Sequence, residues 1–286
     1  AWPFDYRDDA QSRFVNERVH ANIQKDGTFS VVPRMWGGLT TPDELRAIAD
    51  VADRFKIPTV KVTGGQRIDL LGVRKEDLPA VWADLNAAGL VSGYAYAKGL
   101  RTVKTCVGTD WCRFGTQDST GLGVKLEKFL CGSWTPAKVK LAVSGCPRNC
   151  AEATVKDIGV ICVESGYDIH IGGAAGLHVR ATDLLGHVTT EEEVIEYVAA
   201  VMQLYREQAA YLDRMYKWVE RNGLDAIRKA IMEDHAGRKA LLARFEQSQR
   251  VARRDPWAER AAGRELREFT PLAVLTPARP KALAAE

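Results

Sequence analysis

Four of the six cysteines in the sequence occur as two closely spaced pairs. Cys106 and Cys112 are separated by five residues, and Cys146 and Cys150 by three. Four thiolates are enough to hold a cubane iron–sulfur cluster with one cysteine per iron. Structural zinc sites usually pair their cysteines across a shorter gap of two residues. The spacing therefore favours an iron–sulfur site and leaves zinc and buried structural thiols as alternatives.

The remaining cysteines, Cys131 and Cys162, have no partner at a comparable spacing. We expect both to be small apolar core residues, a common state of a free cysteine. All six cysteines fall in one central part of the chain, whereas disulfide scaffolds distribute theirs through a small secreted domain. The clustering therefore indicates metal or redox chemistry in a cytoplasmic setting.

Two lysines precede the second cysteine pair on a short basic segment. Lys138 and Lys140 alternate with other residues over 138–143, so a strand there places both ammonium groups on one face. Such a face is either solvated or directed at an anion. Upstream, Arg34 precedes a Gly-Gly turn and Arg67 follows another, and guanidinium groups suit bidentate binding of oxyanions.

The residues before Gly89 alternate between strand and helix patterns. Strands are predicted over 29–32, 60–63 and 68–71, and helices over 42–55 and 75–85. Thr41, Pro42 and Glu44 are typical of a helix start, with an N-cap, a proline in the first turn and a capping-box partner. The order of strand, helix, two strands and helix predicts an α+β unit of ferredoxin-like type.

The elements after Gly89 must position the cysteines and lysines. A hairpin is predicted over 158–171, and the sequence becomes helical from Thr189. Apolar residues then recur at spacings of three and four from Ile195 to Val219. This pattern predicts one long helix with a single apolar seam, packed on its own domain or on a second copy. Residues 270–286 are expected to be a loose tail.

The composition excludes several classes of protein. With 46% apolar and 27% charged residues, the 286-residue chain can bury a core and form two modest domains. A formal charge of +3 gives no reason to expect a nucleic-acid partner. Neither a run of eighteen apolar residues nor a signal-peptide pattern occurs, so we expect a cytoplasmic protein without a membrane partner.

The sequence around the cysteines resembles that of a known enzyme family. Segments 105–112 and 145–150 resemble the paired siroheme and cluster motif of the nitrite and sulfite reductases. The resemblance implies that the four paired cysteines hold a [4Fe–4S] cluster and that Cys150 also bridges it to the iron of a siroheme. Such a bridge would couple a one-electron reservoir to the metal that binds the substrate.

The same resemblance implies roles for basic residues and glycines. It implies that Lys138 and Lys140 contact the substrate and supply protons, and that Arg34 and Arg67 help to bind it over the siroheme. Gly65 stands where the family has its second substrate arginine, and Arg67 lies two residues further on. A further set of residues is implied to meet the siroheme carboxylates. These are Arg113, Arg148, Gly172, Gly173 and Gly176.

The resemblance covers nearly the whole chain and is nearest to the C-terminal half of the large subunit of bacterial NAD(P)H nitrite reductases. It implies a catalytic module that reduces nitrite to ammonia. A sulfite reductase module and a non-catalytic iron–sulfur electron-transfer module are the alternatives. The expected fold is α+β throughout. An extension over 1–24 precedes a ferredoxin-like half-domain over 25–92, a siroheme and iron–sulfur domain over 98–187, and a helical region over 188–286.

The sequence also bears on the electron donor. No Gly-x-Gly-x-x-Gly dinucleotide turn occurs, and the nearest candidate, Gly121 and Gly123, has Leu126 in place of the third glycine. We therefore expect electrons from a flavoprotein domain or a ferredoxin. Monomeric members of the family carry two ferredoxin-like and siroheme units, whereas one is found here, so we expect a homodimer.

Overall fold

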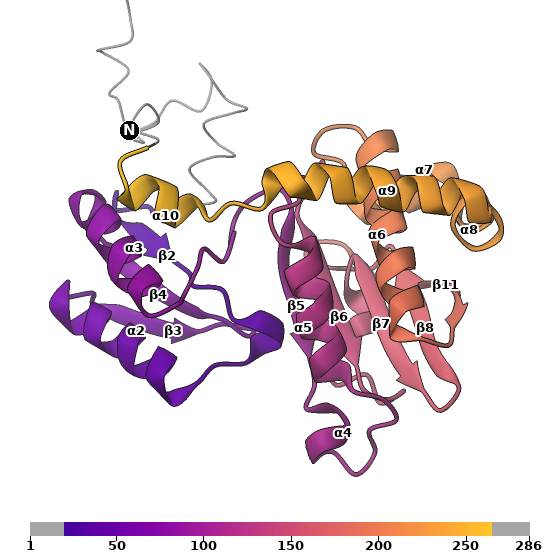
Figure 1. Ribbon diagram of the computed structural model, residues 1–286, viewed down its shortest axis with the longest axis horizontal. Helices are drawn as coiled ribbons and strands as arrows, with labels where there is room; N and C mark the ends of the chain where they lie inside the picture. The colour runs from indigo at the N-terminus through magenta and orange to yellow at the C-terminus, as the bar shows by residue number, and fades with distance from the viewer. Residues whose placement is uncertain (1–19, 265–286) are drawn as a thin grey trace, which may run out of the picture.

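A four-stranded antiparallel sheet with two packed helices forms the N-terminal unit of the computed structural model, which describes residues 20–264 (Figure 1). Its strand order is β1-β2-β4-β3. Its elements are β1 (Asn22–Ile23), β2 (Phe29–Val31), η1 (Trp36–Gly38), α2 (Pro42–Arg54), β3 (Thr59–Val62), β4 (Ile68–Val73), η2 (Lys75–Asp77) and α3 (Leu78–Ala87). The predicted order of strand, helix, two strands and helix is confirmed, with β1 added before it.

The first helix of this unit begins where it is predicted to, and the second begins three residues later than predicted. The Thr41 hydroxyl accepts a hydrogen bond from the Glu44 amide at 3.2 Å, and the Glu44 carboxylate accepts one from the Thr41 amide at 3.0 Å. The predicted capping box is therefore confirmed. The second helix begins at Leu78 rather than Lys75, because Pro79 fits only the first turn of a helix, where its missing N–H needs no partner.

The second unit is built on a five-stranded mixed sheet of order β11-β8-β7-β6-β5. Its elements are β5 (Leu100–Thr105), α4 (Gly108–Trp111), α5 (Ser119–Leu130), β6 (Val139–Ser144), η3 (Ala153–Val155), β7 (Ile158–Val163), β8 (Gly166–Ile171), β9 (Ala174–Ala175), β10 (Val179–Arg180) and β11 (Asp183–Val188). β5, β6 and β7 run parallel, and β7 pairs antiparallel with β8. The predicted hairpin over 158–171 is confirmed.

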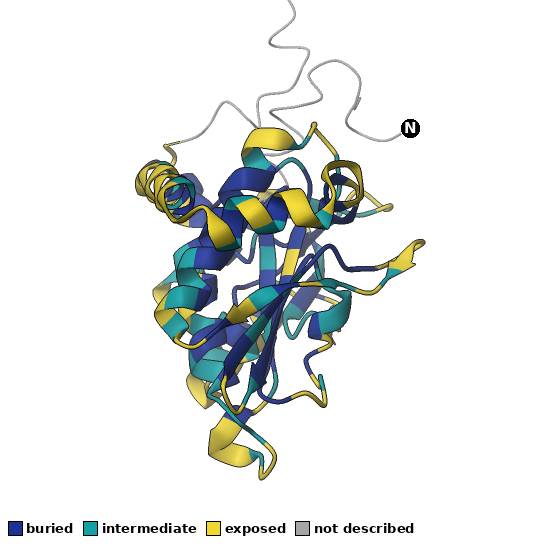
Figure 2. Ribbon diagram, turned by 90° about the vertical axis from the view of Figure 1, so that its right-hand side faces the viewer, coloured by how far each residue is buried: buried dark blue, intermediate teal, exposed yellow. Residues whose placement is uncertain are grey.

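The two faces of β6 differ in what they contact. Val139, Leu141 and Val143 are fully buried in the main core, against α5 and α6. Lys138 and Lys140 occupy the alternate positions, so they lie on the opposite face, as predicted from the strand period. Figure 2 shows the buried residues following the strands and the inner sides of the helices.

The C-terminal region is helical but does not contain one long helix. Its elements are α6 (Glu191–Gln208), α7 (Met215–Asn222), α8 (Leu224–Arg228), a π-helical turn η4 (Lys229–Glu233), α9 (His235–Ala252) and α10 (Pro256–Ala261). The predicted continuous helix is wrong, because the chain leaves the helix after Gln208. Leu212 takes a positive φ of 69°, and its amide donates to the Pro136 carbonyl at 2.9 Å. The apolar seam packs within its own domain, with Val198 and Met202 fully buried.

The last described helix returns to the N-terminal unit. Trp257 of α10 is fully buried in the same core as Trp82 and Leu85, and its Nε1 donates to the His20 carbonyl at 2.7 Å. Asp255 accepts a hydrogen bond from Asn86 at 2.7 Å. The helical region therefore holds the two units together, as Figure 1 shows across the top of the molecule.

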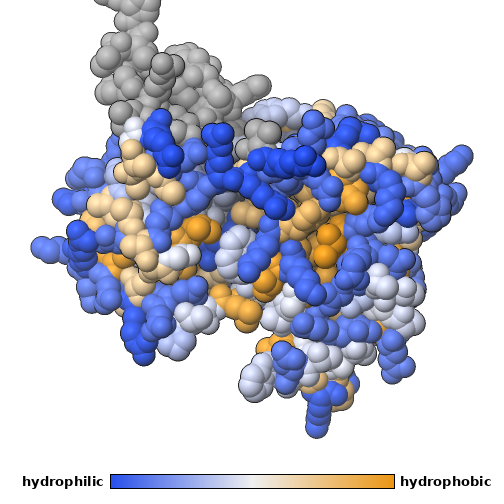
Figure 3. Space-filling view, in the orientation of Figure 1, coloured by the Kyte–Doolittle hydropathy of each residue, from blue (hydrophilic) through white to orange (hydrophobic). Residues whose placement is uncertain are grey.

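The face of the molecule seen in Figure 3 is mostly hydrophilic, with apolar side chains gathered toward its middle. Within residues 20–264, no helix is both long enough and apolar enough to cross a membrane. The expected tail over 270–286 and most of the expected extension over 1–24 lie outside the described residues.

Candidate active site

The four paired cysteines line one cavity of about 580 Å³ at an edge of the second sheet. Cys106 directly follows β5 and Cys112 ends α4, while Cys146 and Cys150 follow β6. β5 and β6 are parallel neighbours, so their carboxyl ends meet at the same edge. All four are free thiols. The two cysteine pairs, which are separate in the sequence, thus lie together in the structure. We name this space the cysteine cavity.

Cys106 sits where its thiolate is favoured. Burial raises the pKa of this thiol, but hydrogen bonds from the Ser119 hydroxyl and the Gly108 and Gly145 amides outweigh burial and leave the pKa below its usual value. The Gly145 amide donates to the Cys106 sulfur at 3.1 Å. A Cβ on Gly145 would lie 3.2 Å from that sulfur, so glycine lets the backbone approach it. Because the thiolate is the ligating form, this geometry suits a metal ligand.

The arrangement of the cysteines fits a cluster better than a single ion. Among residues 20–264, no three His, Cys, Asp or Glu side chains are grouped so that they could hold one metal ion. A structural zinc ion would need four ligands within about 2.3 Å of one centre. A cubane takes one thiolate per iron and spreads the four sulfurs around a larger body. The four thiols and the space between them therefore fit the cluster.

The two other cysteines lie apart from this cavity. Cys162 is fully buried in the main core, and burial raises its pKa to about 12. Burial also raises the pKa of Cys131, whose carbonyl accepts a hydrogen bond from Gln249 at 3.0 Å. Both thiols are therefore neutral. Cys162 is a small core residue, whereas Cys131 is only partly buried and lies outside the core clusters of the described residues.

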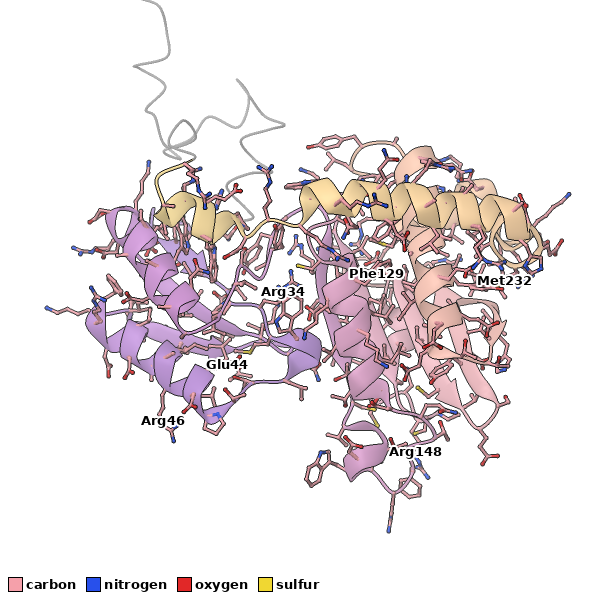
Figure 4. The ribbon with its side chains drawn as sticks, viewed as in Figure 1. Arg34, Glu44, Arg46, Phe129, Arg148 and Met232 are labelled. Atoms are coloured by element: carbon pink, nitrogen blue, oxygen red, sulfur yellow. The ribbon has the colours of Figure 1, made fainter. Side chains whose placement is uncertain are left out.

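The two arginines beside the cysteines stack on one aromatic ring. Arg148 lies over the ring of Phe114 at 4.0 Å from its centroid, and Arg113 lies 4.7 Å from it. Arg148 lines the cysteine cavity, below α5 in Figure 4. Arg113 is exposed and does not line it. Of the two predicted carboxylate contacts, the structure thus brings only Arg148 to the cavity.

A second cavity lies on the sheet face that carries Lys138 and Lys140. It has a larger chamber of about 530 Å³ and a smaller one of about 210 Å³, and both are lined by Lys138, Lys140 and Lys156. The larger chamber reaches the β9–β10 hairpin and α7. The smaller one reaches the N-terminal unit at residues 63–65. We name the two chambers together the basic cavity.

The ammonium groups of Lys138 and Lys140 have no hydrogen-bond or ion-pair partner within the described part of the chain. Burial lowers the pKa of both lysines from 10.5. The charge of Arg214 adds to this effect at Lys138, and the charges of Lys138 and Lys156 add to it at Lys140. Two unpaired cations in a half-buried cavity form a site for an anion.

Arg67, which is expected to help bind the substrate, lines the smaller chamber. Its Nη1 donates to the Arg101 carbonyl at 3.2 Å, and its Nε is buried without a partner within residues 20–264. Burial and the charge of Arg34 lower the pKa of Arg67 to about 10, so its guanidinium is still charged at neutral pH. An anionic group in the chamber would satisfy the unpaired donor.

Arg34 does not reach the basic cavity. Its guanidinium is buried between the two units (Figure 4) and forms an ion pair with Glu127 of α5 at 2.6 Å. It also donates to the Arg101 carbonyl at 3.2 Å, the same carbonyl that Arg67 contacts. A buried carboxylate on α5 thus holds one end of the guanidinium, whereas its Nε and Nη2 atoms are buried without a partner within residues 20–264.

The glycine-rich turn is only partly available to a ligand. The Gly172 amide donates to the Asp157 carbonyl and the Gly173 amide to the Lys156 carbonyl, both at 2.9 Å. These two amides are therefore occupied within the fold. Gly176, at the tip of the β9–β10 hairpin, does line the larger chamber.

Several cationic residues of the basic cavity were missed from the sequence. Lys104 pairs in register with Ala142 and so shares the face of Lys140. Strand alternation could have identified Lys104 as well. It lies on the strand before the first cysteine pair, two residues before Cys106, much as Lys138 and Lys140 lie on the strand before the second pair. The other missed lining residues come from separate elements and carry no local signal. They are Arg101, Lys156, Arg214 and Lys217.

Comparison with protein families and known structures agrees with this geometry. The family model of the nitrite and sulphite reductase 4Fe-4S domain matches residues 96–240, and that of the nitrite/sulfite reductase ferredoxin-like half domain matches residues 22–88. A nitrite reductase [NAD(P)H] of Bacillus subtilis is 57% identical over 257 residues, which are 90% of this chain and 31% of that protein.

Two further matches have different lengths. An assimilatory-type sulfite reductase of Nitratidesulfovibrio vulgaris is 38% identical over 218 residues, which are 76% of this chain and 99% of that protein. The solved structure of the Mycobacterium tuberculosis NirA protein superposes with a TM-score of 0.61 at 24% identity, covering 73% of this chain and 41% of that one, and so shares the fold.

The chain spans less than a third of the first nitrite reductases that it matches, at 31%, 23% and 27% of their lengths. The 4Fe-4S domain match nevertheless covers half of the chain, and the sulfite reductase is matched over almost its full length. The chain therefore belongs to the nitrite and sulfite reductase family, and its membership implies a [4Fe–4S] cluster and a siroheme as cofactors.

Proposed function

We propose that this chain is the catalytic module of an assimilatory nitrite reductase, which reduces nitrite to ammonia. The observation that carries the proposal is that Lys138 and Lys140 have no partner within the described residues and line the basic cavity. The wall of that cavity continues along β5 into the cysteine cavity. Lys104 lines the first and lies two residues before Cys106, which lines the second. The relatives named nitrite reductase [NAD(P)H] support nitrite as the substrate.

The cysteines would bind the cofactors, and the basic residues would bind the substrate and supply protons. Cys106, Cys112, Cys146 and Cys150 would hold the cluster, and Cys150 would also ligate the siroheme iron. When bound, these groups supply single electrons and the metal that receives the substrate. The protein residues must then hold an anion and deliver protons, because six electrons and eight protons convert nitrite to ammonium and two water molecules.

Lys138, Lys140 and Arg67 are the groups placed to do this. Their charges hold nitrite in the smaller chamber, and the lowered pKa of the lysines brings their ammonium protons closer to neutral pH. Arg34 acts as a positioning residue, because it shares the Arg101 carbonyl with Arg67. Arg113, Arg148, Gly172, Gly173 and Gly176 remain proposed neighbours of the siroheme carboxylates, and Gly176 and Arg148 have the better access.

The electron donor and assembly complete the proposal. Electrons come from a flavoprotein domain or a ferredoxin, the protein acts in the cytoplasm, and a second copy of the chain forms a homodimer. Relatives described as large subunits of nitrite reductase support an electron-donating partner domain or subunit. A sulfite reductase module is the second candidate, because the sulfite reductase relative has nearly the same length as the matched region.

The test is turnover of the siroheme-loaded protein with reduced methyl viologen, nitrite and sulfite being compared on one preparation. Lys138→Ala and Lys140→Ala should each lower nitrite turnover by about two to three powers of ten, as loss of a transition-state donor does. Lys25→Ala, an exposed lysine on the β1–β2 turn, serves as the control. Near-normal turnover in both cavity variants would refute the site, and faster reduction of sulfite would make the second candidate the function.

A further inference from the structure

A buried carboxylate joins two cationic elements of the basic cavity. Asp157 precedes β7, and its side chain is 1% exposed. One of its oxygens accepts the backbone amide of Lys140 at 2.8 Å, and the other accepts the Nη2 group of Arg214 at 2.8 Å. Asp157 therefore fixes Arg214, which comes from the C-terminal helical region, against the strand that carries the lysines.

Arg214 is held at a second point by the backbone. It stands directly before α7, and the loop that leads to it is tied to the segment before β6 by the hydrogen bond from the Leu212 amide to the Pro136 carbonyl at 2.9 Å. With both the side chain and the loop fixed, the guanidinium has a defined position in the wall of the larger chamber. Such preorganisation lowers the entropic cost of binding a ligand.

One N–H donor of the Arg214 guanidinium has no hydrogen-bond acceptor within the described residues. The Nε of Arg214 is buried and has no partner within residues 20–264, although Nη2 is bound to Asp157. A buried cationic N–H without an acceptor is unfavourable unless a ligand supplies one. An oxygen of an anion in the larger chamber would satisfy it.

The charge and size of the larger chamber indicate which anion this is. Lys138, Lys140, Lys156 and Lys217 line it with Arg214, and the carboxylate of Asp157 is already shared between Arg214 and the Lys140 amide. A space of about 530 Å³ is far larger than a triatomic anion requires. It has room for a carboxylate-bearing part of a larger molecule.

We infer that Arg214 is a binding residue for a carboxylate group of the siroheme, and that Asp157 positions it. The inference rests on the proposed function for the presence of siroheme. It gives the C-terminal helical region a direct part in the site, which nothing in the local sequence around α7 suggests. Nitrite, in contrast, is held in the smaller chamber by Arg67, Lys138 and Lys140.

The test is a titration of the cluster-loaded, siroheme-free chain with siroheme, followed by its Soret absorbance. Arg214→Lys keeps a cation beside Asp157 but removes the planar fork of donors, and should weaken siroheme binding about tenfold. The double variant Asp157→Asn/Arg214→Gln removes both charges and leaves neither unpaired, and should weaken it further. Arg221→Gln, which breaks the surface ion pair of α7 with Asp213, is the matched control and should bind as the unchanged chain does.

Melting temperatures and nitrite affinity separate the outcomes. A weaker siroheme complex in a variant that melts like the unchanged chain supports the inference, because a purely structural role would move the melting temperature instead. Unchanged siroheme affinity in both Arg214 variants overturns it. Loss of nitrite affinity with unchanged siroheme affinity also overturns it, since Arg214 would then serve the substrate. If the unchanged chain itself binds no siroheme, the proposed function fails as well.

Discussion

At the scale of single residues, the chemistry of this protein depends on charged side chains that form no ion pair or hydrogen bond within the described part of the chain. Lys138 and Lys140 keep their ammonium groups free in the described structure, whereas Lys104 and Lys156 pair with Glu152 at 3.1 and 2.8 Å. The paired lysines shape the wall of the basic cavity. The unpaired ones remain available to an anion and to proton transfer.

The lowered pKa of the two free lysines gives a signed pH dependence. In the cofactor-free protein, the pKa of both lysines should lie below 10.5, since burial and neighbouring cations disfavour the charged form. NMR titration of the ¹³C-methylated protein measures this directly. Lys156→Gln removes a cation near Lys140 and should raise its pKa, whereas Asp157→Asn should lower it further.

Activity should follow the same sign. A lysine that has lost its proton no longer attracts nitrite, so kcat/KM should fall as the pH rises through the pKa of these groups. Siroheme carboxylates bring negative charge to the cavity, so they should move this fall to higher pH than in the empty protein. A pKa at or above 10.5 for both lysines in the empty protein would contradict the prediction.

The cysteines give a second prediction at this scale. Serine at any one of the four cysteines of the cysteine cavity should cause loss of cluster iron and sulfide, because each iron takes one thiolate. Cys131→Ser and Cys162→Ser should retain the cluster, since both thiols lie apart from that cavity. Iron and sulfide analysis of purified variants measures the outcome. Full retention of iron in Cys146→Ser would show that the ligand set is wrong.

The sequence predicts those site residues that follow a local rule. Spacing predicts the cysteine pairs, and strand alternation predicts that Lys138 and Lys140 share a face. Arg214 could not be predicted, because it reaches Lys140 only through the buried Asp157. The ion pair of Arg34 could not be predicted for a similar reason. No sequence pattern reveals that Glu127, ninety-three residues away, takes its guanidinium.

At the scale of elements, the starts of α2 and α6 could be predicted, and the end of α6 could not. Thr190 forms a capping box with Glu193, so α6 begins beside the predicted Thr189. Its end is set by long-range contacts, because the loop after Gln208 binds the Pro136 carbonyl and Asp157. Apolar residues continue at helical spacing through that loop, so periodicity alone extends the helix too far.

The contact of η1 with α5 gives a prediction on stability. Glu127 and Arg34 are both fully buried, and the Glu127 carboxylate also accepts the Gly37 amide at 2.8 Å. Gly37 has a positive φ of 63°, which brings that amide to the carboxylate. Glu127→Gln leaves the cation of Arg34 without its counter-ion and should lower the free energy of unfolding by about 3–5 kcal/mol.

Chemical denaturation measures this loss. Asp225→Asn, which breaks an exposed ion pair with Arg228, is the control and should cost less than about 1 kcal/mol. The double variant Arg34→Met/Glu127→Leu should recover most of the loss, because it removes both buried charges. A cost below about 1 kcal/mol for Glu127→Gln would mean that this ion pair does not hold the two units together.

At the scale of the whole molecule, the C-terminal region links the two units. α6 packs on the second sheet and α9 packs on α6, and α10 then returns to bury Trp257 against α3 of the N-terminal unit. The class and order of the two units could be predicted, since each has its own strand and helix pattern. The return of α10 could not, because a short helix of six residues carries no signal for its distant partner.

The whole chain should neither bind NAD(P)H nor be reduced by it. A dinucleotide site needs free backbone amides at a helix N-terminus that follows a Gly-rich turn. The nearest glycine pair, Gly121 and Gly123, lies inside α5, and the Gly121 amide already donates to the Asp118 carboxylate at 2.8 Å. That carboxylate would also repel a pyrophosphate from the positive end of the helix.

Fluorescence titration with NADH and with NADPH should therefore give no saturable binding. The siroheme-loaded protein should stay oxidised when either is added alone, yet turn over nitrite once reduced methyl viologen is supplied. A flavoprotein donor mixed with the chain serves as the positive control, because it should restore reduction by NAD(P)H. Reduction of the haem by NADH without any flavoprotein would contradict the prediction and would require a dinucleotide site that the sequence pattern does not reveal.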